Sequence, residues 1–154
     1  MSNPSATLRE VEQTLHSVIE SLIDAQKGFQ KIGEELKDPT LKSYFLEESL
    51  QRAEFRGNLE TVLHHEGVHD IKEGGTAGAT LHRTWAQLKA KLGGGDHSLL
   101  ETAEQDEHAS MKAYNEALHK ELPLPVRQLL VSQVAHIQLF HEYVRSVRRS
   151  ADLG

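Results

Sequence analysis

The chain has 154 residues, which suits one domain with one hydrophobic core. Charged residues make up 26% of it and the formal net charge is −6 with histidine neutral, so the positive charge expected of a nucleic-acid-binding protein is missing. The sequence has no cysteine, which excludes disulfides and thiolate metal sites. It contains no run of eighteen apolar residues and no charged-then-apolar leader, so we expect a cytoplasmic protein that does not bind membranes.

A regular apolar seam predicts a long helix near the start of the chain. Apolar residues recur in steps of three and four from Leu8 to Leu36. This spacing lines one face of a helix roughly 43 Å long. A helix of that length in a small soluble protein must pack against others like it, so the seam predicts a helix bundle.

Capping residues and prolines mark the later helices. Asp38 followed by Pro39 predicts the N-cap and the first position of a second helix. Ser98 with Glu101 predicts a capping box at the start of a third helix, and a Pro-Leu-Pro sequence separates it from the last one. The four predicted long helices span about 8–36, 40–66, 98–121 and 125–149.

A glycine-rich segment, residues 67–97, connects the second and third long helices. It holds a short predicted helix near 79–92, which Trp85 would anchor to the bundle. A connection this long can run back along the bundle, which makes the second and third long helices parallel. The sequence therefore predicts one all-α domain over residues 1–154, a ferritin-like four-helix bundle whose long crossover carries a short fifth helix.

Three of the predicted helices place polar side chains on their inner seams. Glu48 and Arg52 point inward from the second helix, Glu107 from the third and His141 from the last. In the crossover topology Glu48, Glu107 and His141 lie at one end of the bundle, about 15 Å in. We therefore expect them to converge, and a pairing with Glu107 would raise the pKa of His141.

One interpretation of this convergence is a metal site. Carboxylates and imidazole at one level suit iron, manganese or zinc. A di-metal centre of the ferritin type needs a Glu-x-x-His motif on two helices, whereas the last helix has Gln133-x-x-His136. The pattern thus favours a single ion over a di-metal centre. The predicted ligands are Glu48, Glu107 and His141, with Glu104 and His108 as outer-shell residues.

The other interpretation is a buried salt-bridge network without a cofactor, and we favour it. Arg52 lies one helical turn from Glu48 and can bind Glu48 or Glu107 through two hydrogen bonds. Buried charges need such partners or a metal, and an inward arginine repels a divalent cation. No catalytic residue is predicted, which leaves open whether the protein is an enzyme. The further expected members of the network are Tyr114, Gln133 and Trp85.

Several short motifs of the chain are shared with a known family. The most specific is the glycine-rich run from Gly74 that leads into His-Arg-x-Trp at Trp85. The other motifs are Gly28-Phe29, Gln51-Arg52-x-x-Phe55, Glu104-x-x-Glu107 followed by Tyr114, and His141-Glu142. With them, residues from about 8 to 148 resemble a bacterial family of ferritin-like four-helix-bundle proteins classed as a domain of unknown function. Phe29 replaces that family's usual tyrosine, and His108 replaces an acidic residue.

This resemblance implies a ferritin-like bundle and supplies no substrate or reaction; the link to stress-associated ferritin-like proteins is an analogy at the level of the fold. We expect a non-enzymatic protein that acts through self-association, for example as a dimer, or through a protein partner. The alternative is a protein that binds iron, manganese or zinc and takes part in metal handling or in oxidative stress. Neither alternative involves nucleic acid.

Overall fold

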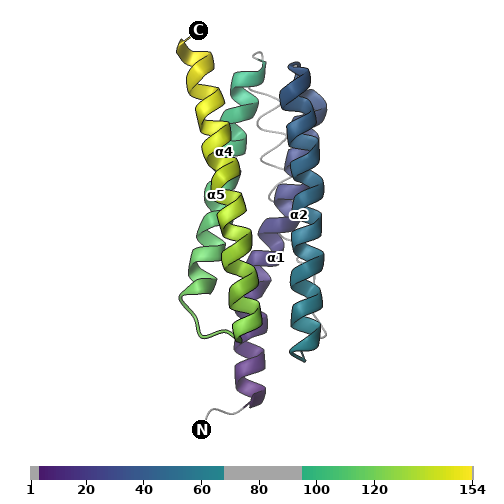
Figure 1. Cartoon of the computed structure of the whole chain (residues 1–154), viewed down its shortest axis with the longest axis vertical. Coiled ribbons are helices and arrows are strands. Elements are labelled where there is room, and N and C mark those ends of the chain that lie inside the picture. Colours follow the sequence, from purple (N-terminus) through teal and green to yellow (C-terminus); the bar gives the residue numbers. More distant parts are fainter. Residues whose placement is uncertain (1–3, 68–94, 154) are drawn as a thin grey trace.

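The computed structural model describes residues 4–67 and 95–153, and these form four α-helices (Figure 1). The helices are α1 (Pro4–Glu35), α2 (Pro39–His65), α4 (Asp96–Leu118) and α5 (Leu124–Leu153). The prediction of an all-α four-helix bundle is confirmed. The short helix predicted near 79–92, together with Trp85, lies outside the described residues.

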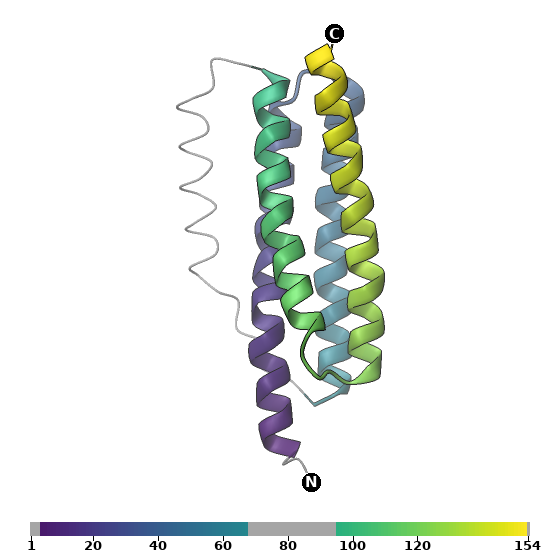
Figure 2. The same ribbon diagram turned by 90° about the vertical axis from the view of Figure 1, so that its left-hand side faces the viewer.

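The helices run in the directions that the long crossover predicts. In Figure 1, α1 and α5 run upward while α2 and α4 run downward, so α2 and α4 are parallel. Figure 2 shows α4 beside α5 and in front of α1, and α4 packs against both. Neighbouring helices are antiparallel in each case, because α1 packs against α2 and α4, and α5 packs against α4 and α2.

The start of α4 is attached to the turn between α1 and α2. The carboxylate of Asp96 accepts hydrogen bonds from the backbone N–H groups of Lys37, at 2.9 Å, and Asp38, at 3.1 Å. Asp38 is the N-cap of α2, as predicted, and its side chain accepts from the N–H groups of Thr40 and Leu41. The carboxylate of Asp96 thus holds the turn to α4, and the carboxylate of Asp38 caps the start of α2.

Other helix ends differ from the predictions. Helix α4 begins at Asp96 with Gly95 at its N-cap position, so the predicted capping box of Ser98 and Glu101 is wrong. The carboxylate of Asp96 takes over the favourable place in the first turn, next to the positive end of the helix dipole. Helix α1 begins at Pro4, a residue favoured at the first helical position, and α5 continues to Leu153.

Buried apolar side chains form two clusters at successive levels of the bundle. The predicted seam of α1 is buried from Val11 to Leu36 and contributes to both. A layer of buried polar side chains lies between the two clusters on α2 and α4, and Gln133 adds a buried polar group on α5. Within the described part of the chain, no helix combines the length and apolar character needed to cross a bilayer. The polar layer is therefore the feature of the core that requires an explanation.

Candidate functional site

Arg52 lies at the centre of the polar layer and is completely buried. Its Nε donates to Oε2 of Glu48 at 2.7 Å, and its Nη2 donates to Oε1 of Glu107 at 2.6 Å. Glu48 precedes Arg52 by one turn of α2, whereas Glu107 reaches in from α4. The guanidinium therefore joins two helices through charge-assisted hydrogen bonds. The buried network predicted from the sequence is present.

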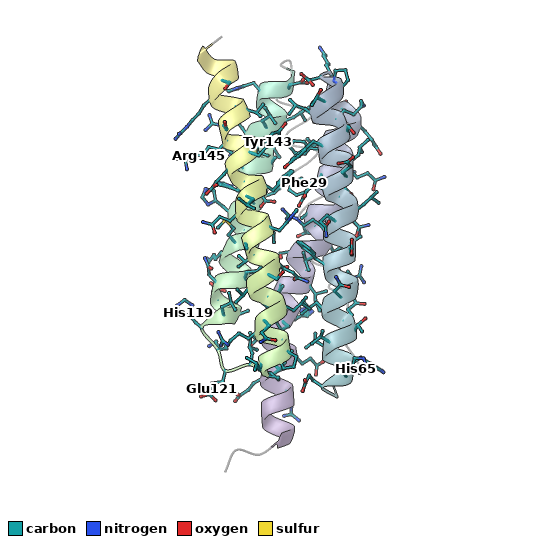
Figure 3. The ribbon with its side chains drawn as sticks, in the orientation of Figure 1. Phe29, His65, His119, Glu121, Tyr143 and Arg145 are labelled. Carbon is teal, nitrogen blue, oxygen red and sulfur yellow. The ribbon has the colours of Figure 1, made fainter. Side chains whose placement is uncertain are left out.

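Aromatic rings from the other two helices lie next to the same guanidinium. The Cζ atom of Arg52 lies 5.0 Å from the ring centroid of Phe29 on α1 and 5.6 Å from that of Phe140 on α5. Both distances are within the range of cation–π attraction. The other three helices thus all contact Arg52, which lies on α2. Figure 3 shows Phe29 inside the bundle. Phe29 is also the position at which the family that the sequence resembles usually has a tyrosine, so the tyrosine hydroxyl is replaced here by a hydrogen atom.

The histidine of the network is His136, not the predicted His141. Nε2 of His136 lies 2.8 Å from Oε1 and 3.0 Å from Oε2 of Glu48. The edge of its ring also meets Phe55, with the two centroids 5.2 Å apart. Glu48 therefore bonds to a cation on its own helix and to an imidazole on α5, and this places both of its oxygens in the network.

A second chain of hydrogen bonds continues the layer. The hydroxyl of Tyr114 donates to Oε1 of Gln133 at 2.7 Å, and Nε2 of Gln133 donates to the backbone carbonyl of Phe55 at 3.0 Å. The amide of Gln133 thus uses both its acceptor and its donor. Burial raises the pKa of Tyr114, so this hydroxyl keeps its proton. Tyr114 and Gln133, predicted as members of the network, thus bond to each other and to the backbone of α2.

His141 lies elsewhere, next to His108 in an open groove between α4 and α5. The centroids of the two imidazole rings are 5.4 Å apart and the ring planes are inclined at 67°. Partial burial, and then the proximity of His108, lower the pKa of His141. The expectation that His141 pairs with Glu107 and gains a raised pKa is therefore wrong. Glu104, predicted as an outer-shell residue, forms an ion pair with Arg148.

Two further acidic residues, which the sequence patterns did not single out, are Asp24 on α1 and Asp106 on α4. Burial, together with the nearby Asp24, raises the pKa of Asp106 to about 7. Burial, and then the proximity of Glu20, raises the pKa of Asp24 to about 6. Burial also raises the pKa of Glu107, although Arg52 opposes that rise. Asp24, Asp106 and Glu107 are therefore carboxyl groups that bind protons close to neutral pH.

The predicted metal ligands are only partly brought together. Arg52 bridges Glu48 and Glu107, and His141 lies in the groove next to His108. Among residues 4–67 and 95–153, no three histidine, aspartate or glutamate side chains are arranged to hold a metal ion. In the same residues, Oε2 of Glu107 and Nη1 of Arg52 are buried without a hydrogen-bond partner. The layer is thus an ion-pair network with one unsatisfied oxygen and one unsatisfied nitrogen.

Fold and site together define an all-α four-helix bundle whose core is divided by a buried arginine–carboxylate layer. Comparison with family models adds a second finding. The chain belongs to the family described as Domain of unknown function (DUF2383), whose model matches residues 10–120. None of the curated proteins matches the chain in sequence.

Proposed function

We propose that this protein is non-enzymatic and acts through its surface, by self-association or by binding a protein partner. The observation that supports this is the position of Arg52 between Glu48 and Glu107. Its guanidinium supplies the positive charge that two inner carboxylates require. Because Arg52 and Glu107 are both fully buried, their ion pair is closed to a substrate and stabilises the bundle, and the layer reaches the surface at His136, whose side chain is 41% exposed.

A second candidate function is metal binding by a reduced carboxylate–histidine site, in a bundle that we propose is of the ferritin-like type. The unpartnered Oε2 of Glu107 favours this candidate, because a cation would satisfy a buried oxygen. Iron, manganese or zinc would suit Glu48, Glu107 and a histidine. Arg52 weighs against it, since a divalent ion would sit next to a guanidinium.

Metal content separates the two candidates. Protein without a His-tag, purified from iron- and zinc-supplemented cells, is analysed by plasma mass spectrometry alongside Glu107→Ala and Glu107→Gln. A His65→Ala variant controls for binding by exposed histidines, since His65 projects from the end of α2 (Figure 3).

For a surface-acting protein we expect folded parent without stoichiometric metal. One ion per chain that is lost in both Glu107 variants, and retained in His65→Ala, would overturn the proposal in favour of metal binding. Circular dichroism shows that each variant remains folded, so that a loss of metal can be assigned to the missing carboxylate.

A further inference from the structure

The outer face of α5 has a different character from the rest of the surface. The exposed residues from Leu124 to Leu139 include no lysine, arginine, aspartate or glutamate, although 26% of the residues in the chain are of these types. The face is about 22 Å long at 1.5 Å per residue. Among the described residues it carries three large exposed apolar side chains: Leu124 is 64% exposed, Val131 51% and Leu139 67%.

The spacing of these three side chains is self-complementary. Val131 follows Leu124 by seven residues and precedes Leu139 by eight, so it lies close to the midpoint. An antiparallel pair of α5 helices, related by a two-fold axis near Val131, would place Leu124 of each copy against Leu139 of the other. Ser132 and Ala135 lie on the same exposed face, and their small side chains allow the two helix backbones to approach closely.

The charges at the two ends of this face fit the same arrangement. Lys120 and Glu121 are exposed just before α5, and Glu142 and Arg145 are exposed just beyond the uncharged stretch. Figure 3 shows Glu121 and Arg145 on the same side of the bundle, near opposite ends of α5. The two-fold axis that pairs the leucines therefore brings Arg145 of each copy to the end that holds Glu121 in the other. In this register Glu142 lies level with Glu121 of the other copy, and Lys120 and Arg145 supply the positive charges that balance the two glutamates at each end.

We propose that this face of α5 is the interface of an antiparallel homodimer, with a second copy of the chain as its occupant. The proposal rests on the proposed function, in which the protein acts through its surface. The net charge of −6 opposes the approach of two copies elsewhere, whereas the uncharged face removes that repulsion where they meet. One pair of helices buries an area at the small end of specific interfaces, below about 1,200 Å², so the dimer should dissociate on dilution.

Sedimentation velocity over a wide range of protein concentration tests the proposal. We expect the parent to shift from one to two chains per particle as its concentration rises. Leu139→Lys should raise the dissociation constant about tenfold or more, because the symmetry places the substitution in the interface twice. The matched control is Leu50→Lys, since Leu50 is 71% exposed on α2, outside the α5 face; it should leave the constant unchanged.

Charge reversal tests the orientation of the two copies. Arg145→Glu should weaken the dimer, because it adds a third acidic side chain to the end that holds Glu121 and Glu142, and adding Glu121→Arg should restore it. A parent that stays monomeric at every concentration, or equal effects of Leu139→Lys and Leu50→Lys, would overturn the interface. Either outcome leaves the proposed function intact with a protein partner in place of a second copy, whereas only stoichiometric metal in the parent contradicts the proposed function.

Discussion

Replacing Arg52 by methionine should destabilise the bundle more than any other single substitution of a charged residue in the layer. Methionine keeps much of the apolar volume between Phe29 and Phe140, but it leaves Glu48 and Glu107 without their shared cation. Removing one partner of a buried ion pair costs about 3–5 kcal/mol. The total stability of a domain is about 5–15 kcal/mol, so Arg52→Met should retain only a small margin.

Equilibrium unfolding in urea, followed by far-UV circular dichroism, measures this loss. The matched control is Arg56→Met, because Arg56 forms an ion pair with Glu60 one turn along α2, at 2.7 Å but with both side chains partly exposed. Helical pairs at this spacing that remain in contact with solvent contribute about 0.3–0.5 kcal/mol. If Arg52→Met costs no more than Arg56→Met, the buried layer does not stabilise the fold in the way described.

The loss of unfolding free energy in Arg52→Met should also depend on pH. Because burial raises the pKa of Glu107, this carboxyl can take up a proton when its cation is removed, which relieves an unpaired buried charge. Arg52→Met should therefore be less destabilising at pH 5 than at pH 8. Adding Glu107→Leu should recover most of the loss at pH 8, because a buried pair can be replaced by apolar side chains at little cost.

Three further predictions concern pH, glycine and a helix cap. Asp106 and Asp24, whose pKa values are raised to about 7 and about 6, hold protons in the folded chain that the unfolded chain releases above about pH 4. Their contribution to stability therefore falls between about pH 4 and pH 7, and Asp106→Asn should raise urea stability at pH 8 but not at pH 4. Gly57→Ala should stabilise α2 by about 0.5–1 kcal/mol in thermal unfolding, since the new methyl group meets open space. Gly33→Ala should gain less or lose stability, because its methyl group would lie 2.8 Å from Leu46. Asp38→Ala should cost about 1 kcal/mol in the same assay, through the loss of the α2 cap.

The fold followed from the sequence because its signals are local and periodic. The seam of α1 repeats over many turns, and Asp38 with Pro39 defines the start of α2 through neighbouring atoms alone. The pairing of Arg52 with Glu48 was also predictable, since a spacing of four residues places them on one face. The predicted capping box at Ser98 is wrong because Asp96, two residues earlier, already lies in the first turn of α4.

His136 and not His141 meets Glu48 because the helix ends do not lie at the same level. His141 would be level with Glu48 only if the end of the last helix were aligned with the start of α2. In Figure 1, α5 extends past the start of α2, so the residue level with Glu48 lies deeper along α5. That residue is His136. The contacts of Arg52 with Phe29 and Phe140 were also beyond the sequence, because a buried aromatic residue has the same pattern whether it meets a leucine or a guanidinium.

The arginine–carboxylate layer gives the bundle a single register, which an apolar core of the same volume would not. Sliding α2 by one turn moves Arg52 about 5.4 Å along the bundle and separates it from Glu107, whereas leucine and valine side chains exchange neighbours at a small cost. Because Glu48 moves together with Arg52 on α2, the shifted arrangement would leave Glu107 as a buried charge without its cation, at a cost of about 3–5 kcal/mol. Arg52→Met with Glu107→Leu should therefore be nearly as stable as the parent in urea, yet show weaker amide-exchange protection along α2 and α4. Protection equal to that of the parent would mean that apolar packing alone sets the register.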